Sequence, residues 1–251
     1  MIGNLLEQLR TAHIEILGDN LAGLYVHGSI AFGCFNEKTS DVDFLSVVRE
    51  PITDEQARAL CAVLYALSAK APEKGLEMSV VLLDMTQHPI HPAPFELHFS
   101  NMYKDHEFDS LIHHPRLCDP DLAAHFAVTR TAGFSLHGLS VREAFAPVPK
   151  AMYIEAIMAD VGAANEDICA NPTYITLNLC RALAYAQDEL ILSKKAGGEW
   201  ALENLPPRLH FPIEAALQAY TGGEAIDVGA DALMDYAEAM LSRLESCRGG
   251  L

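Results

Sequence analysis

Two apolar runs joined by a Gly-Ser pair and a loop constrain this chain more than any other feature. Residues 24–27 lead into Gly28 and Ser29, and after a loop Asp41 and Asp43 open a second apolar run. The pattern predicts a strand, a tight turn, a loop and a second strand. Because residues two apart on a strand point to the same side, we expect both carboxylates on one face.

The chemistry of these residue types favours phosphate transfer. Two neighbouring carboxylates repel each other unless a cation lies between them. Hard divalent ions, Mg²⁺ above all, prefer oxygen ligands and usually bind together with substrate phosphates. Gly28 permits close approach of the backbone to a phosphate, and Ser29 can donate from its hydroxyl and its amide. Each motif alone is more often a turn or a solvated edge, but their order between two apolar strands predicts a metal-dependent phosphoryl or nucleotidyl transfer site.

Length and composition indicate one large domain or two modest ones. The chain has 251 residues, of which 50% are hydrophobic, so a sizeable core can form without metal or disulfide. The amphipathic segment 1–17 lacks the pattern of a signal peptide, and no segment approaches the roughly 18 apolar residues of a membrane span. The 6 cysteines are dispersed, which is typical of reduced thiols. We therefore expect a cytoplasmic protein without a membrane partner.

Net charge limits the partners. The formal charge of −17 argues against a nucleic-acid partner, because phosphate contacts need clustered Lys and Arg. An acidic surface favours encounter with a polycationic small molecule, although many cytoplasmic enzymes are acidic for solubility alone. The acidic surface and short loops are compatible with a monomer.

The order of elements predicts an α+β chain in two parts. Strands are expected over 22–27, 42–48, 76–83 and 95–99, with helices over 2–18, 53–71, 121–132 and 141–145. After Pro147 and Pro149 only helical spacing remains, over 150–164, 174–194, 201–205, 212–220 and 230–247. Mixed elements followed by helices predict a domain at 1–149 and an all-α domain at 150–251.

The motifs resemble those of a known family. His27-Gly28-Ser29 with Ser40-Asp41-Val42-Asp43 is similar to the motif of the nucleotidyltransferase superfamily that includes DNA polymerase β. Segments 95–99, 119–123, 178–181 and 200–206 resemble the aminoglycoside adenylyltransferases that act on streptomycin and spectinomycin, in the same order over nearly the whole chain. The resemblance implies a nucleotidyltransferase domain with a small mixed sheet flanked by helices, then a helical bundle, with the active site between them. It also implies transfer of AMP from ATP to an antibiotic hydroxyl.

The resemblance implies two Mg²⁺ ions held by Asp41, Asp43 and a third carboxylate. We expect Glu96, in a short apolar strand, to be that third ligand and the catalytic base, because the family's base is expected at this position. Glu77 on the preceding strand is the competing third carboxylate, with a supporting role. The three side chains of Asp41, Asp43 and Glu96 should converge.

Nucleotide contacts are expected from six residues, on the same resemblance. These are Gly28, Ser29, Ser40, Arg181, Lys194 and Tyr220. Arg181 lies in an apolar run, where an unpaired guanidinium is costly. Spacing alone leaves its anionic partner open between a carboxylate and a phosphate. Lys195 is the alternative to Lys194.

The substrate side carries the weakest signal. The family has acidic streptomycin-binding residues near Asp167 and Asn171, and Asn171 is neutral where a second carboxylate is expected. The only tryptophan is Trp200, whereas streptomycin-modifying members can carry one just before the segment 119–121. These departures count against streptomycin more than against adenylyl transfer. The alternative for each acid is a solvated helix end.

Two other patterns favour local structure over chemistry. Asp119 and Asp121 flank a proline before a helical run, which indicates an N-cap. His88 and His91 lie in a Pro-containing loop without suitable co-ligands for a metal.

Two other function classes stay open. One is a nucleotidyltransferase that modifies a protein or another small hydroxylated metabolite, and the other is a small-molecule sensor that retains the fold. Pyrophosphate release with an antibiotic panel separates these classes from the first.

Overall fold

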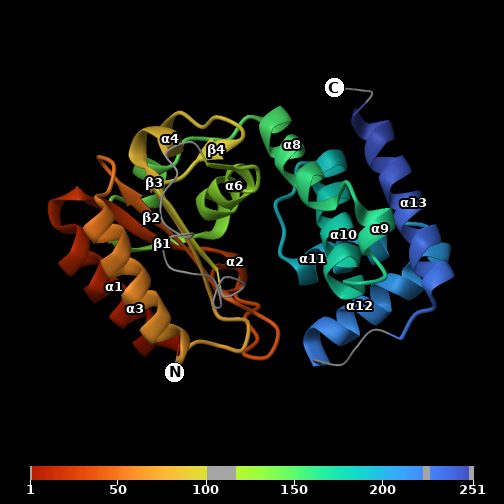
Figure 1. Ribbon diagram of the computed structural model, residues 1–251. Coiled ribbons are helices and arrows are strands. Elements are labelled where there is room, and N and C mark those ends of the chain that lie inside the picture. The colour runs from red at the N-terminus through yellow and green to blue at the C-terminus, as the bar shows by residue number, and fades with distance from the viewer. Residues whose placement is uncertain (1, 101–116, 223–226, 249–251) are drawn as a thin grey trace. The chain divides into compact units, whose positions relative to one another are not determined.

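The computed structural model describes residues 2–100, 117–222 and 227–248 (Figure 1). The chain divides into two compact units, Met1–Met152 and Tyr153–Leu251. The change of architecture expected from the sequence falls after Pro149. A separate functional role for each part stays a prediction.

The first unit is built on a mixed sheet, as the resemblance implies, with five strands where four were expected. The strands, in spatial order, are β5 Leu97–Ser100, β3 Leu76–Leu82, β2 Val42–Val48, β1 Leu21–Val26 and β7 Phe134–Gly138. β2 and β3 are parallel, and the other neighbours are antiparallel. The edge strand β7 was not expected, because its segment lacks a long apolar alternation. A separate ribbon pairs β4 Ala93–Pro94 with β6 Cys118–Asp119.

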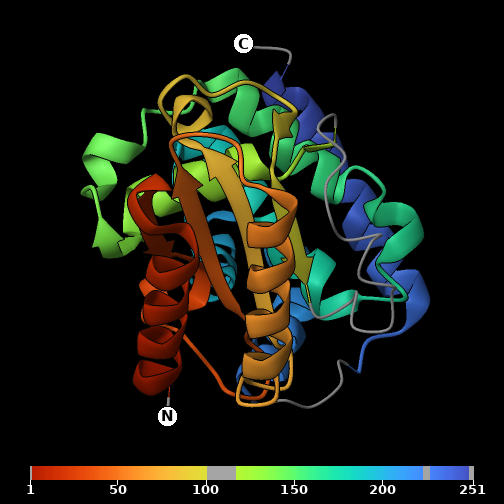
Figure 2. The ribbon, with the colours of Figure 1, turned by 60° about the vertical axis from the view of Figure 1, so that its left-hand side comes forward.

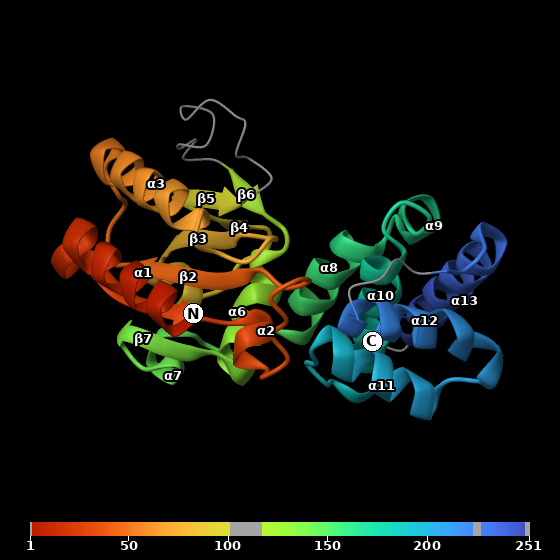
Figure 3. The same ribbon diagram turned by 90° about the horizontal axis from the view of Figure 1, so that it is seen from below.

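Helices cover both faces of this sheet. α1 Ile2–Leu17 and α3 Asp54–Ser68 lie side by side on one face (Figure 2), where Leu9, Leu60 and Phe44 are fully buried. The other face packs against α6 Leu122–Ala132 and α7 Val141–Ala144 (Figure 3). Shorter elements are η1 Gly18–Asn20, α2 Gly28–Ala31 and α4 Leu83–Gln87.

The start of α3 is a capping box. The Thr53 hydroxyl accepts a hydrogen bond from the Gln56 backbone N–H, and the Gln56 side chain accepts one from the Thr53 N–H. This capping box satisfies two N–H groups that a helix start leaves without intrahelical partners.

The second unit is helical. Its elements are α8 Lys150–Val161, which begins in the first unit, α9 Ala164–Asp167, α10 Pro172–Asp188, α11 Lys194–Asn204, η3 Pro207–Leu209, α12 His210–Gly222 and α13 Ala230–Arg248. The central helix α10 packs against α11, α12 and α13 (Figure 1). The expected single helix over 174–194 is wrong. α10 ends at Asp188 because Glu189 adopts a left-handed conformation with φ 56°, and Lys194 begins the next helix.

Within the described ranges, none of the helices combines the length and the apolar character that crossing a membrane requires.

Candidate active site

Strand register brings three carboxylates together in the first unit. Asp41 directly precedes β2, and Asp43 is paired in register with Glu77 on the parallel strand β3. One oxygen from each of Asp41, Asp43 and Glu77 lies within 4.8 Å of the others, and all three residues are half-buried. In the part of the chain that the structure describes, this is the one group of carboxylate, histidine or cysteine side chains arranged to hold a metal ion. An all-oxygen anionic set of this kind suits a hard divalent cation.

Glu96 does not join this group, which corrects the expectation from the sequence. Its carboxylate accepts a hydrogen bond of 3.2 Å from the Ile52 backbone N–H, beyond the end of β2. Its own N–H donates to the Val80 carbonyl. Glu96 therefore lies near the carboxyl end of β3, whereas Glu77 lies at the start of that strand.

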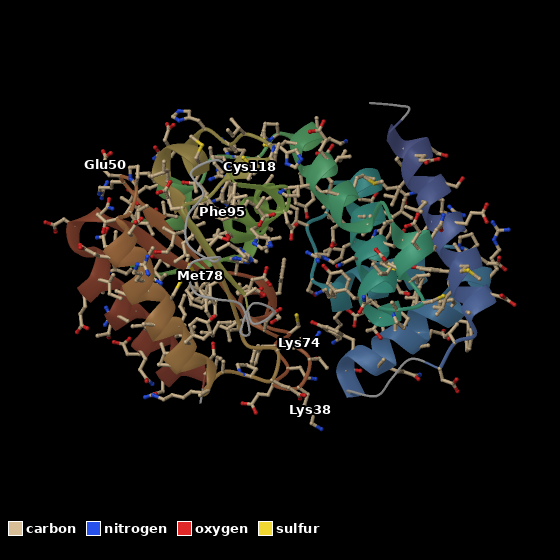
Figure 4. The ribbon with its side chains drawn as sticks, in the orientation of Figure 1. Lys38, Glu50, Lys74, Met78, Phe95 and Cys118 are labelled. Atoms are coloured by element: carbon tan, nitrogen blue, oxygen red, sulfur yellow. The ribbon has the colours of Figure 1, made fainter. Side chains whose placement is uncertain are left out.

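The reason is the antiparallel direction of β5. The residue opposite Glu77 is Ser100, and Glu96 lies four positions earlier, a separation of about 13 Å at roughly 3.3 Å per residue. Lys38 and Lys74 precede β2 and β3 at the carboxylate end of the unit, and Phe95, the neighbour of Glu96, lies away from them (Figure 4). Glu77, expected in a supporting role, is the third carboxylate.

Gly28 makes the approach of Asp43 possible. Its φ is +61°, and a Cβ at this position would lie 1.8 Å from Oδ2 of Asp43. The His27 backbone N–H donates to the Asp43 carbonyl at 3.0 Å, so the turn after β1 is fastened to β2. Only glycine combines this backbone conformation with room for the carboxylate.

Ser29 and Ser40 flank the carboxylates but differ in their bonding. The buried Ser29 hydroxyl has no hydrogen-bond partner among the described residues, which is costly unless a ligand supplies one. The Ser40 hydroxyl accepts a hydrogen bond of 3.1 Å from the Asn36 N–H and closes the loop before Asp41. Ser29 is thus available to a phosphate, and Ser40 shapes the loop.

A half-buried histidine, His125 of α6, is close enough to the same carboxylates to feel their charge. Nε2 of His125 lies 3.0 Å from Oδ2 of Asp121, and the histidine side chain is 17% exposed. Burial lowers the pKa of His125, but the charge and hydrogen bond of Asp121, with the charges of Glu77 and Asp43, outweigh it and raise the pKa to about 10. The resulting cation offsets part of the repulsion within the carboxylate group.

Two neighbouring histidines behave in the opposite way. Burial and the charge on His125 lower the pKa of His27, whose ring lies 4.9 Å from that of His125. Burial also lowers the pKa of His98, whose Nδ1 lies 2.9 Å from the Ser79 hydroxyl. His125 is therefore the charged member of this cluster. Sequence reasoning missed it, because nothing in residues 121–132 except the i, i+4 spacing of Asp121 and His125 marks the pair.

The cations expected to bind phosphate lie in the second unit. Arg181, half-buried on α10, donates from Nη1 to Asn178 Oδ1 at 2.9 Å and from Nε to the Leu192 carbonyl at 2.8 Å. Lys194, the first residue of α11, has its Nζ 4.7 Å from the centre of the Tyr174 ring. Spacing alone left open whether a carboxylate or a phosphate pairs with Arg181. Its hydrogen-bond partners are a neutral amide and a neutral carbonyl, so its positive charge is not neutralised by them and is available to an anion.

The remaining expected residues also lie in the second unit. Tyr220 is half-buried near the end of α12, and Asp167 and Asn171 are exposed on either side of the turn between α9 and α10. Their roles stay predictions. In the first unit, Asp121 directly precedes α6, but its side chain makes no capping hydrogen bond to that helix, unlike the expected N-cap. Asp119 accepts a hydrogen bond of 2.8 Å from the Asp121 N–H.

These features fit the metal-dependent nucleotidyl transfer site that the motifs predict, on a mixed sheet followed by a helical part. Residues 143–243 match the family model described as "Aminoglycoside adenylyltransferase, C-terminal domain". A spectinomycin 9-adenylyltransferase from Staphylococcus aureus is 26% identical over 212 residues, covering 83% of this chain and 81% of that protein. One from Enterococcus faecalis is 24% identical over 212 residues, covering 82% of each.

Solved structures agree at the level of the fold. The spectinomycin adenyltransferase AAD(9) from Enterococcus faecalis, solved with ATP and spectinomycin, superposes with a TM-score of 0.82 at 21% identity, covering 97% of this chain and 99% of that one. The family model, these relatives and the shared fold agree with the resemblance to the aminoglycoside adenylyltransferases seen in the motifs.

Proposed function

We propose that this chain transfers AMP from ATP to a hydroxyl group of an aminocyclitol or aminoglycoside antibiotic and releases pyrophosphate. The observation that carries the proposal is the group of Asp41, Asp43 and Glu77 beside the Gly28-Ser29 turn. The relatives named for spectinomycin make that drug the first candidate and streptomycin the second.

The donor set fits Mg²⁺, because three carboxylates supply only oxygen and remain partly exposed. Asp41 and Asp43 would hold the ion or ions, and bound Mg²⁺ would neutralise charge on the triphosphate. Ser29, whose buried hydroxyl has no partner among the described residues, would donate to a phosphate oxygen. Gly28 would keep the backbone close enough for this contact.

The transfer step itself is a substitution at the α-phosphorus. The antibiotic oxygen forms a bond to that phosphorus while the bond to the bridging oxygen of the β-phosphate breaks, and the electron pair leaves with pyrophosphate. The hydroxyl proton passes to a carboxylate. In our proposal Glu77 accepts it, because it is the carboxylate grouped with Asp41 and Asp43 among the described residues.

The second unit would supply the remaining contacts. Arg181, Lys194 and Tyr220 would bind the nucleotide, and Asp167 with Asn171 would contact the cationic drug. Charge-assisted bonds from a guanidinium to phosphate are among the stronger hydrogen bonds in proteins. The net charge of −17 supports attraction of a polycation.

We further propose that the protein acts in the cytoplasm as a monomer. All six cysteines lie in the described ranges and are free thiols, which supports a reducing compartment.

The proposal is tested by incubating the chain with ATP, Mg²⁺ and an antibiotic panel while pyrophosphate is measured. Spectinomycin should drive release, and Asp43→Asn should abolish it. Release driven by a protein acceptor and by no drug would instead favour a protein-modifying enzyme. Binding of spectinomycin without any release would favour a sensor.

A further inference from the structure

A branched polar network in the second unit is centred on Asp160, in the last turn of α8. Its Oδ2 accepts a hydrogen bond of 2.9 Å from Nδ2 of Asn178, and its Oδ1 accepts one of 2.8 Å from the Tyr174 hydroxyl. Asn178 and Tyr174 are i, i+4 neighbours on α10. One carboxylate thus fixes two side chains on the facing helix.

The first branch runs through Asn178 to Arg181. A guanidinium can only donate, so Asn178 must present its oxygen to Arg181, and this leaves its NH₂ group for Asp160. The 2.9 Å bond from Arg181 Nη1 to Asn178 Oδ1 agrees with that orientation. Because Asn178 is only 4% exposed, an amide without these partners would be costly. The Asp160 carboxylate can only accept, so it requires the NH₂ group of Asn178 on its side and fixes the amide in the orientation that presents its oxygen to Arg181.

Two other contacts hold the Arg181 side chain. Its Nε donates to the Leu192 carbonyl at 2.8 Å. Gly197 of α11 lies against its stem, since a Cβ there would lie 2.7 Å from Arg181 Cγ. Nε and Nη1 are thereby committed, and Nη2 makes no hydrogen bond to the described residues. The guanidinium is held in one plane with a donor nitrogen left for an anion.

The second branch runs through Tyr174 to Lys194. The Tyr174 hydroxyl is bound to Asp160, and the Lys194 ammonium lies 4.7 Å from the centre of the Tyr174 ring. A cation over an aromatic face is attracted by the ring quadrupole. Tyr174 is 41% exposed, so this branch is weaker than the buried branch through Asn178.

We infer that Asp160 is a positioning residue for the nucleotide, which aligns Arg181 through Asn178 and Lys194 through Tyr174. The inference rests on the proposed function, in which Arg181 and Lys194 bind the ATP phosphates. Both oxygens of Asp160 already accept bonds within its own unit. This distinguishes it from the exposed Asp167, which is our candidate for contact with the drug.

The test is the affinity for MgATP, measured by isothermal titration on the full chain. In Asp160→Asn, an NH₂ group replaces one of the two carboxylate oxygens, so either Asn178 or Tyr174 loses its acceptor. The dissociation constant for MgATP should therefore rise about tenfold. Asn178→Ala should have a similar effect, and Tyr174→Phe, which keeps the ring beneath Lys194, about twofold. Asp235→Asn, an exposed exchange on α13, is the matched control and should leave the affinity unchanged.

A mutant cycle separates positioning from general loss of structure. In an Arg181→Ala background, Asn178→Ala should change MgATP affinity by less than about twofold, because its target is already absent. Additive effects would overturn the inference. If Asp160→Asn does not fold, Asn178→Ala and Tyr174→Phe test the same network.

Further outcomes are decisive. Weakened spectinomycin binding with unchanged MgATP affinity in Asp160→Asn would overturn the inference and make Asp160 a drug ligand. A wild-type chain that binds MgATP but is silent with every antibiotic would contradict the proposed function alone. A wild-type chain that does not bind MgATP would overturn both.

Discussion

The two units build their charged sites in different ways. In the first unit, Asp43 and Glu77 meet because two strands far apart in the sequence pair in parallel register. In the second, Asn178 and Arg181 meet because they are i, i+3 neighbours on one helix. The group of carboxylates therefore depends on long-range strand pairing, whereas the position of the Arg181 guanidinium depends partly on local helical spacing. On the proposed function, changes in the first unit should affect the chemical step, and changes in the second should affect nucleotide affinity.

The largest effect is expected from exchanging the carboxylates themselves. Glu77→Gln should lower kcat by about 10²–10⁴-fold, the usual contribution of a proton acceptor. Glu96→Gln should stay within about threefold, because Glu96 bonds to the Ile52 N–H away from the group. Pyrophosphate release with MgATP and spectinomycin measures both. The reverse order would restore Glu96 as the base.

Gly28→Ala should lower activity by about a hundredfold. The new Cβ would lie 1.8 Å from Asp43 Oδ2, which forces the carboxylate or the turn to move. The matched control is Gly33→Ala, where φ is +69° and nothing lies within 4 Å. Both changes should cost about 1–2 kcal/mol of stability through the left-handed backbone, measured by urea unfolding. Equal activity losses would show that backbone conformation alone is responsible.

Acid should destabilise the first unit through His13. Burial lowers its pKa to about 4, against a backbone hydrogen bond to Leu9 that raises it. The folded chain keeps His13 neutral. Its contribution to the free energy of unfolding is therefore fully present above the unfolded-state pKa near 6.5 and is lost as the pH falls toward 4. Between pH 7.5 and 5 the loss should be about 2 kcal/mol.

Comparing wild type with His13→Leu isolates this contribution. The variant should lose less stability between the same two pH values, measured by urea unfolding. The buried Tyr236 and Cys180 of the second unit contribute no such acid loss, because a phenol and a thiol are neutral in acid and burial raises the pKa of both further. An unchanged pH profile in the variant would contradict the assignment.

The smallest effect is expected from Arg181→Lys. Lysine keeps the charge but loses the bonds that Nε and Nη1 make to Leu192 and Asn178. The KM for ATP should rise about tenfold, while kcat and the KM for spectinomycin stay within about twofold. Steady-state kinetics with each substrate varied in turn would show it. A fall in kcat without a change in KM would remove the contrast between the two units.

Local patterns predicted most of the elements. The apolar run that Asp41 and Asp43 open predicted β2, and helical spacing over 53–71 predicted α3. The short strand β7 was not predicted, because its pairing with β1 stabilises it and its own residues carry little strand pattern. The end of α10 after Asp188 was not predicted either. Glu189 adopts a left-handed conformation there, and a residue other than glycine gives no sequence signal for it.

The Gly28-Ser29 turn and the shared face of Asp41 and Asp43 could be predicted from the sequence alone, because both follow from backbone geometry over a few residues. Which distant carboxylate joins them depends on the packed fold, since strand register and direction place Glu77 there and Glu96 elsewhere. The same holds for the charge on His125, which depends on carboxylates brought to it by β2, β3 and its own helix. Long-range pairing and burial are properties of the packed chain, and no local pattern encodes them.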